Sequence, residues 1–302
     1  GATWKEALVV DRSSGAVSMP FTSAGVVREN LFRNPDFTIN QRGFAFGALA
    51  DGAYGVDGWK AAGAANLGWS ATDLTLTVNA GAIRQVVEPA QWGFATLASQ
   101  QVTVSVEGLL GASLNVQVGT ASGSITPGGG RRSVTLTLGA GDTGNLTVTL
   151  TPSAYPAWFR RAKLEAGSTA STWSARPLAG EIAICQRYFT KSMRLAITPG
   201  NGVGYATDSV FGIGGSLSSA AAYGPFVVFP ARMRTVPTVA LYRTNLAAGD
   251  GMWQYLSGAW VSATGMSVPA VSETGFLAQL AGTFTTGQAI AVAGGWAAAA
   301  EL

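Results

Sequence analysis

The side chains that could do chemistry in this 302-residue sequence are mainly carboxylates and aromatic rings, because histidine is absent and Cys185 is the single cysteine. Without histidine, the ordinary Ser-His-Asp and Cys-His nucleophiles cannot form. His-based zinc sites are excluded as well, since one cysteine cannot replace the missing ligands. No G-x-x-x-x-G-K-[ST] phosphate-binding loop occurs either.

Cleavage of a glycoside would need two carboxylates on either side of the bond, roughly 5–9.5 Å apart. The acidic residues considered for such a pair are Asp57, Asp73, Glu88, Glu107, Glu165, Asp208, Asp250 and Glu273. Asp57 and Asp250 belong to turn-like D-G pairs, and Glu88 precedes a proline at a strand end. The sequence pairs none of them, so we expect a protein that is not an enzyme, and a polysaccharide depolymerase is the enzymatic alternative.

Aromatic residues give the clearest signal for binding, because nine tryptophans are many for a chain with 12% charged residues. Sugars lay their C–H faces on aromatic rings and pair their hydroxyls with amide, carboxylate or guanidinium groups. The residues predicted to bind carbohydrate are Trp69, Arg84, Gln91, Trp92, Trp253, Tyr255 and Trp260. The alternative for each tryptophan is a core or subunit contact, which we expect for Trp59 and Trp296.

Composition limits the other function classes. The net charge is +3 and there is no basic stripe, only arginine pairs at 131–132 and 160–161, so we expect no nucleic-acid partner. The apolar run at 289–300 is shorter than the roughly 20 residues that span a bilayer, so we expect no membrane insertion. A surface so poor in charge favours burial between subunits.

Elements able to position these residues are mainly short strands. Runs such as V-T-V-S-V at 102–106 and L-N-V-Q-V at 114–118 alternate apolar and polar residues, which buries one face of each strand. Turn residues separate the runs, a pattern typical of a β-sandwich. Strands are predicted at 74–78, 83–87, 102–106, 114–118, 134–138 and 146–150, and then at 193–198, 226–229, 238–243, 253–256, 260–263, 275–280 and 289–296.

The stretch 158–188 joins the two β-rich regions. It begins as a strand that closes the first region and breaks at Gly167. Pro177 then disfavours the helical conformation for the residue before it, and Leu178, Ile182, Cys185 and Phe189 follow at helical spacing. We predict a helix over 178–189 with the Cys185 thiol on its buried side.

Three segments resemble bacteriophage tail fibres and related receptor-binding virion proteins. The first is K-L-E-A-G-S-T-A-S-T-W-S-A-R-P followed by C-Q-R-Y, in which Lys163 replaces the usual Gln and Trp173 the usual Phe. The second is the hairpin V-D-R-S-S-G-A-V-S-M-P near the start. The third is P-F-V-V-F-P-A-R-M-R-T-V-P-T-V, together with the ending G-W-A-A-A-A-E-L.

The order N-L-F-R-N-P-D-F, D-G-W, I-R-Q-V-V-E and Q-V-T-V-S-V-E-G also resembles jelly-roll carbohydrate-binding modules. In such modules calcium binds near the first and last strands, and Asn34, Asp36 and Glu165 occupy corresponding stretches. The other interpretation, which we favour, is an Asx-type turn at Asn34 with neither metal nor cofactor.

The resemblance implies an all-β homotrimer with an N-terminal hairpin at 1–30, a jelly-roll-like sandwich at 31–177, a linking helix at 178–189 and a sandwich head at 190–302. Its implied partners are other virion proteins, contacted through the hairpin, and a host surface polysaccharide. We therefore expect a fibre or head-spike protein, of a phage or a phage-like gene transfer agent, that acts outside the cell. A purely structural fibre or baseplate component is the alternative.

Overall fold

The computed structural model describes residues 9–10, 17–18, 28–195, 197–202, 210–243, 253–257 and 259–302. This part of the chain is nearly all β, and its two large curled sheets form sandwich- or barrel-like domains, which confirms the predicted fold class. No helix in it is long and apolar enough to cross a membrane.

The chain divides into two compact units, and neither is continuous in sequence. Unit 1 comprises Gly1–Phe32 and Val87–Ala175, and unit 2 comprises Arg33–Val86 and Arg176–Leu302. The predicted hairpin near the start is confirmed, because β1 (Val9–Val10) pairs with β2 (Val17–Ser18) in antiparallel register. The contiguous sandwich boundaries expected from the sequence stay a prediction.

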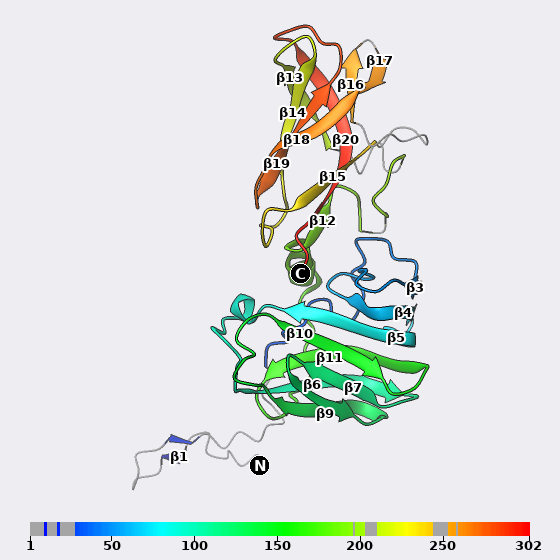
Figure 1. Cartoon of the computed structure of the whole chain (residues 1–302), viewed down its shortest axis with the longest axis vertical. Helices are drawn as coiled ribbons and strands as arrows, with labels where there is room; N and C mark the ends of the chain where they lie inside the picture. Colours follow the sequence, from blue (N-terminus) through cyan, green and yellow to red (C-terminus); the bar gives the residue numbers. More distant parts are fainter. Residues whose placement is uncertain are drawn as a thin grey trace, which may run out of the picture. The chain divides into compact units, whose positions relative to one another are not determined.

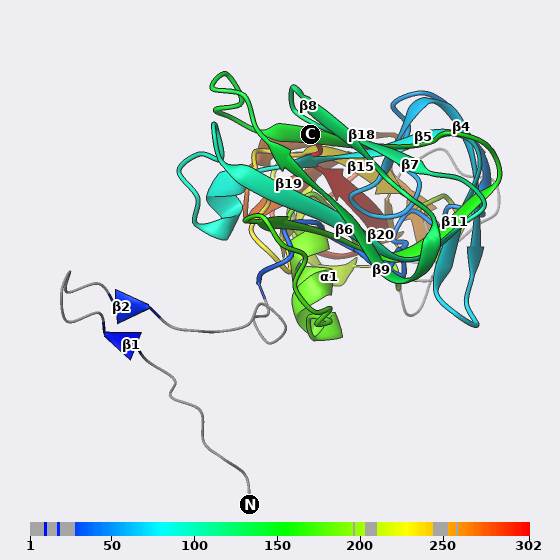
Figure 2. The same cartoon turned by 90° about the horizontal axis from the view of Figure 1, so that it is seen from below.

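The described residues of unit 1 form antiparallel strands and a short 3-10 helix. Its elements are η2 (Pro89–Trp92), β6 (Gln101–Leu110), β7 (Leu114–Val118), β8 (Ala121–Ile125), β9 (Gly128–Thr137), β10 (Leu146–Pro152) and β11 (Ala157–Ala166). β6 pairs with β9 on one side and β11 on the other, and β7 lies between β8 and β10 (Figures 1 and 2).

The alternation of residues along β6 separates the two faces of its sheet. Val102, Val104 and Val106 are fully buried in the core. At about 25 cal/mol per Å² of apolar surface, each such side chain contributes roughly 1.5–3 kcal/mol by burial. The intervening residues of β6 are polar and line the opposite face, where the candidate site lies.

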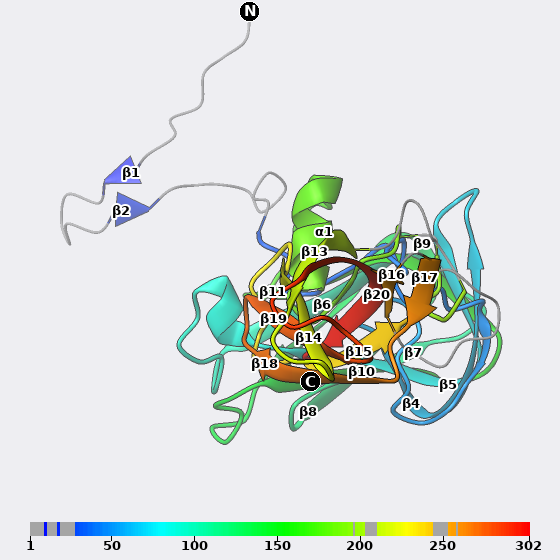
Figure 3. The same cartoon turned by 90° about the horizontal axis from the view of Figure 1, so that it is seen from above.

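Unit 2 contains a three-stranded meander, a helix and a larger sheet. Its elements are β3 (Gly47–Leu49), β4 (Lys60–Ser70), β5 (Thr75–Val87), α1 (Leu178–Gln186), β12 (Phe189–Lys191), β13 (Val210–Ser216), β14 (Ala221–Val228), β15 (Thr238–Tyr242), β16 (Gln254–Ser257), β17 (Ala259–Ser262), β18 (Gly265–Val271), β19 (Gly275–Ala281) and β20 (Ala289–Ala299). The long β20 organises the larger sheet, since it pairs with β12 (Figure 1) and with β13, β15 and β16 (Figure 3).

The two strands predicted at 74–78 and 83–87 form one continuous strand, β5. The residues between them were expected to turn, but Gly81 has φ +70° and lets the backbone bend while pairing continues. A Cβ at Gly81 would lie 2.2 Å from the Ala64 carbonyl oxygen, so only glycine fits at this position of β5.

The strand expected at 193–198 is also wrong for its described residues, which are turns and bends after β12. The strands missed in the sequence include the short β3 and β12 and the longer β4, β8, β13 and β18. The longer ones are rich in alanine, glycine and serine, which carry a weak β signal.

The predicted linking helix is present but shorter than expected. α1 ends at Gln186, and Phe189 already belongs to β12. Its buried side carries Glu181 and Cys185, whereas Leu178 is 63% exposed. The Glu181 carboxylate tolerates burial because it accepts hydrogen bonds from the Asn34 backbone N–H at 2.7 Å and from Arg176 Nε at 2.7 Å.

We expect the Cys185 thiol to resist alkylation in the folded protein. Burial raises its pKa well above the usual range, and the neighbouring carboxylates of Asp57 and Glu181 raise it further, so the reactive thiolate is scarce. Iodoacetamide labelling at pH 8, followed by mass spectrometry, should show little modification of native protein and complete modification in denaturant. Equal labelling rates in the two states would contradict this placement.

Candidate functional site

The polar face of the β9-β6-β11 sheet carries three rows of side chains, which the strand register fixes. Glu165 lies opposite Thr103, which lies opposite Thr135; Lys163, Ser105 and Ser133 form the second row; Arg160, Glu107 and Arg131 form the third. Directly opposed residues on one sheet face are close enough to interact. The strand register therefore places hydroxyl, carboxylate and cationic groups on one surface of the sheet.

Residues 167–173, which we call the strap, follow β11 and fold back over this polar face. The Thr103 hydroxyl donates to the Gly167 carbonyl oxygen at 2.7 Å, and the Thr135 hydroxyl donates to that of Ser168 at 3.0 Å. From the other side, Arg28 Nη1 donates to the Thr169 carbonyl oxygen at 2.8 Å. These bonds fix the first half of the strap.

A buried ion pair fixes the second half. Glu165 accepts hydrogen bonds from the Ser171 backbone N–H at 2.8 Å and from its hydroxyl at 2.5 Å. Lys163 Nζ donates to Ser171 Oγ at 2.5 Å and to the Thr172 carbonyl oxygen at 3.2 Å, and lies 3.4 Å from Glu165. Each charge therefore has several polar partners, which offset the cost of removing it from water. Burial lowers the pKa of Lys163, and Glu165 opposes that shift.

Beyond the strap, the Glu107 carboxylate forms ion pairs with arginines from two strands. Arg131 Nη2 donates to Glu107 Oε1 at 3.0 Å and Arg161 Nη1 to Oε2 at 2.9 Å, while Arg160 Nε lies 3.9 Å away. A β-bulge in β11 turns both consecutive arginines toward the same carboxylate, and Arg161 has φ +51° within it. Left-handed backbone at a non-glycine residue is uncommon and occurs preferentially at functional sites.

Trp173 completes the site at the end of the strap. The Arg131 guanidinium carbon lies 5.3 Å from the centroid of the half-buried Trp173 ring, within the range of a cation–π contact. An open pocket of about 510 Å³ results, lined by Glu107, Arg131, Arg161 and Ala170 to Trp173. It combines an aromatic ring, charged hydrogen-bond donors and a carboxylate acceptor, which is the chemistry of a polar, ring-shaped ligand.

Of the residues predicted as the first carbohydrate group, Trp69 and Arg84 belong to unit 2 and are not brought together there, whereas Gln91 and Trp92 belong to unit 1. Trp69 stacks on Phe46 with centroids 5.9 Å apart, and its buried indole N–H has no acceptor among the described residues. Arg84 lies opposite Lys60, whereas Trp69 lies opposite Leu76. The two pairs lie eight positions apart along β5, at most about 26 Å at 3.3 Å per residue. Gln91 and Trp92 lie in η2, and both are half-buried.

The second predicted group lies in unit 2, partly in its core. Trp253 is fully buried and donates its indole N–H to the Gly295 carbonyl oxygen at 2.9 Å, and Tyr255 is 5% exposed. Neither ring offers a face to a sugar, so the structure places these two in the core, not on a binding surface. Trp260 is half-buried and packs edge-on against Phe211 at 5.6 Å. Trp59 and Trp296 are buried, as predicted.

Residues considered for calcium are occupied by other partners. Asn34 Oδ1 accepts the Ile39 backbone N–H at 2.9 Å, and its amide donates to the carbonyl oxygens of Ile39 and Asp57. These bonds reach Ile39, five residues along the chain, and not the residue two positions on as in an Asx turn, so the turn-forming role stays a prediction. Glu165 binds Ser171 and Lys163, and Asp36 has a partner of its own. No group of three acidic, histidine or cysteine side chains able to hold a metal occurs within the described ranges.

Carboxylates of the polar face are poorly arranged for glycoside cleavage. Glu107 and Glu165 lie four register positions apart along β6, about 13 Å at 3.3 Å per residue, which exceeds the separation that such cleavage requires. Both oxygens of each carboxylate are already hydrogen-bonded. The geometry favours binding over general acid–base catalysis.

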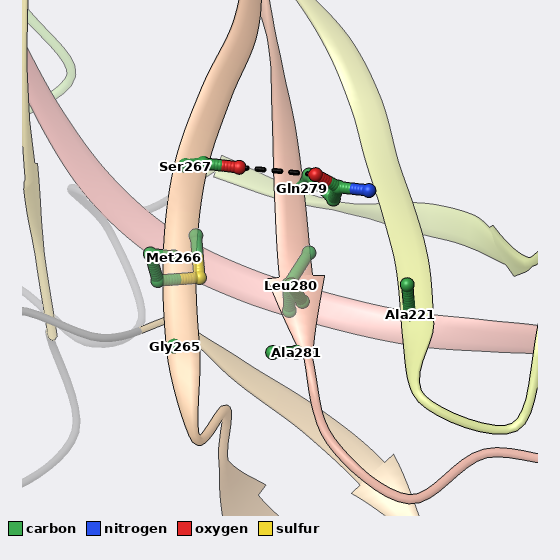
Figure 4. Close-up of a pocket in the computed structure, with 7 residues that line it drawn as sticks. All are labelled: Ala221, Gly265, Met266, Ser267, Gln279, Leu280 and Ala281. Carbon is green, nitrogen blue, oxygen red and sulfur yellow. Dashed lines mark hydrogen bonds between the residues drawn. The ribbon is translucent and has the colours of Figure 1, made fainter.

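Two other depressions lack this combination of groups. One, of about 330 Å³, lies on β18 and β19, where Ser267 Oγ donates to Gln279 Oε1 at 3.1 Å (Figure 4). It contains neither a charged residue nor an aromatic ring. The other, of about 430 Å³, is lined by Tyr255, Phe284, Gln288 and neighbouring residues and has no charged group.

Glu107, Arg131, Arg161 and Trp173 were not predicted as binding residues. Alternation along T-V-S-V-E placed Glu107 on the polar face of β6, but sequence does not show which strands lie beside it. The bulge that turns Arg161 inward depends on the register of β11 against β6. Trp173 was visible in the sequence as a departure from the resembling pattern, but the sequence does not show that it lies beside Arg131.

No protein-family model matches the chain, and no curated protein matches it. Among solved structures, native recombinant discoidin II of Dictyostelium discoideum is similar at 12% identity and a TM-score of 0.20, over 72% of this chain and 76% of that chain. Wild-type discoidin II from the same organism is similar at 11% identity and a TM-score of 0.21, over 76% of each chain. At TM-scores this low, the likeness supports no conclusion about function.

We expect Lys163→Met to lower the free energy of unfolding by about 3–5 kcal/mol, because it leaves Glu165 buried without its counter-charge. The double variant Lys163→Met/Glu165→Met should lose less, since no unpaired charge remains. Urea unfolding followed by tryptophan fluorescence measures both values.

Arg232→Met serves as a control, because it removes an ion pair with Glu273 whose arginine side chain is 73% exposed. It should cost no more than about 1 kcal/mol. A similarly small loss for Lys163→Met would show that the buried pair does not hold the strap.

Proposed function

We propose that the protein is a non-catalytic carbohydrate-binding component of a virion, a fibre or head spike that adsorbs the particle to a bacterial surface polysaccharide. The observation that carries the binding part is the strap pocket: the Trp173 ring beside Arg131, Arg161 and Glu107. A sugar ring stacks on the indole face while its hydroxyl groups pair with the guanidinium groups and the carboxylate.

Adsorption without catalysis agrees with the chemistry of the chain. Histidine is absent from the sequence, and the carboxylates of the pocket are held in ion pairs and hydrogen bonds. A weak site is sufficient when it is repeated, because linked sites raise the overall avidity by about 10²–10⁴-fold without new contacts. A purely structural fibre or baseplate component remains the alternative, and a depolymerase is the enzymatic one.

Location on a virion rests on the three tail-fibre-like segments of the sequence. We propose that the hairpin β1–β2 contacts other virion proteins and that the pocket acts outside the cell. The hairpin suits an attachment role because a two-stranded sheet of this size is marginal alone and needs a partner surface.

An uncovered sheet face in unit 2 supports assembly as a homotrimer. β13, β14, β19 and β20 contain no charged residue. Large apolar side chains on one face of β13 and β14 are strongly exposed: Phe211 68%, Ile213 74%, Phe226 56% and Val228 69%. A second copy of the chain fits this surface, because it is uncharged and contiguous along paired strands.

We expect Trp173→Ala to weaken polysaccharide binding while leaving the fold intact, because the lost ring is half-buried at the rim of the pocket. Stacking on an aromatic ring is worth roughly 1–3 kcal/mol, so affinity should fall by about tenfold or more. Biolayer interferometry on immobilised capsule and lipopolysaccharide fractions measures this loss, with polymer size recorded before and after.

Matched controls are Trp69→Ala and Trp92→Ala, which remove other half-buried tryptophans. Both should bind normally. Loss of binding in these variants, with normal binding by Trp173→Ala, would show that the binding site is not in the strap pocket. Shortening of the polymer would favour the depolymerase instead.

We expect the chain to have the mass of a trimer in light scattering over a wide concentration range. Phe211→Ser/Ile213→Ser should release monomers, because it removes two of the most exposed apolar side chains of the uncovered face. Leu178→Ser is the control, since Leu178 is equally apolar and 63% exposed but lies on α1. A monomeric wild-type chain would refute the trimer.

A further inference from the structure

The strap pocket has an excess of positive charge. Arg131, Arg160 and Arg161 all lie within 4 Å of one carboxylate, that of Glu107. The nearest other carboxylate of the polar face, Glu165, is already matched by Lys163. Arg131 and Arg161 line the pocket together with the single carboxylate of Glu107, so one positive charge of the pocket lining exceeds the charge of Glu107.

Arg161 holds the excess charge where a ligand can reach it. Its side chain is 38% exposed, and Glu107 takes one N–H of its guanidinium group. A guanidinium has five N–H donors in a planar fork. The remaining donors can pair with the two oxygens of an anionic group.

Arg131 is positioned differently from Arg161. Its side chain is 14% exposed, and it is held by Ser105 Oγ at 2.7 Å, by Glu107 and by the Arg161 carbonyl oxygen at 3.2 Å. Arg131 therefore supports the Trp173 ring and contributes its charge to the pocket, while Arg161 makes the direct contact. An uncharged sugar would leave this excess uncompensated, whereas an anionic sugar would neutralise it.

We propose that the ligand of the strap pocket is an anionic sugar residue of the polysaccharide, one whose ring carries a carboxylate or a phosphate group. This inference rests on the proposed carbohydrate-binding function and narrows its substrate class. The ring lies on Trp173, and the anionic group pairs with the Arg161 fork.

The test uses the full chain on an array of purified bacterial surface polysaccharides of known structure: uronic-acid-containing, phosphate-containing and neutral. Binding should be confined to the anionic polymers. Each bound polymer is then probed again after carboxyl reduction with carbodiimide and borohydride, or after removal of phosphate with hydrofluoric acid. Whichever treatment removes the recognised group should reduce affinity at least about tenfold, the size of one lost charge-assisted hydrogen bond.

Three variants, at Arg161 and Arg132, separate binding in the pocket from general electrostatic attraction. Arg161→Gln should lower affinity for the anionic polymers about tenfold or more, and Arg161→Lys should recover only part of it, because the charge returns without the fork. Arg132→Gln removes the same charge from β9 at an exposed residue that bonds to Thr126, so it should bind like the wild type. Thermal unfolding checks that all three variants are folded.

Outcomes of these experiments separate the two proposals. Equal binding of neutral polymers, or of polymers stripped of their anionic groups, would overturn the anionic ligand and leave carbohydrate binding standing. Equal losses in Arg161→Gln and Arg132→Gln would also overturn it, because attraction would then be non-specific. Binding to no polymer on the array would overturn both proposals.

Discussion

The buried ion pair between Lys163 and Glu165 is the interaction on which the candidate site depends. Both side chains point to the polar face of the sheet, where neither could stay charged without partners. Ser171 supplies those partners through its backbone N–H and its hydroxyl. Satisfying two charges on β11 thus requires the strap to lie across the sheet, and this placement carries Trp173 to Arg131. The hydrogen bonds that stabilise the buried ion pair therefore also position Trp173 in the candidate site.

Residues that carry the tail-fibre resemblance divide into two roles. Arg176 of the first segment pairs with Glu181 inside unit 2, and Glu301 of the final signature forms an ion pair with Arg42 there. They hold backbone segments together and leave little capacity for a ligand. Lys163 and Trp173, where the chain departs from the pattern, both belong to the strap site. Glu165, which follows the pattern, belongs to the strap site as well, so the site combines a residue of the pattern with two departures from it.

The fold class followed from the sequence because alternation buries one face of each strand, and β6, β7 and β10 lie close to where their patterns placed them. Strands built of alanine and glycine, such as β4 and β13, were missed because their positions are set by pairing partners far away in sequence. The residues of the candidate site were not predicted for the same reason. Glu107 and Arg161 are 54 residues apart and meet only through strand register and a bulge. Burial of Trp253 was likewise not predictable, since its place depends on Gly294, where a Cβ would lie 2.0 Å from the indole.

Fluorine NMR of the full chain labelled with 5-fluorotryptophan tests the central claim most directly, because each of the nine tryptophans gives its own resonance. The Trp173 signal is assigned by its loss in Trp173→Phe. Addition of a surface polysaccharide that the chain binds should shift the Trp173 resonance in a saturable manner and leave those of buried Trp59 and Trp253 unchanged. If the Trp173 signal does not move and a saturable shift occurs at Trp69, Trp92 or Trp260 instead, a binding site in the strap pocket is contradicted.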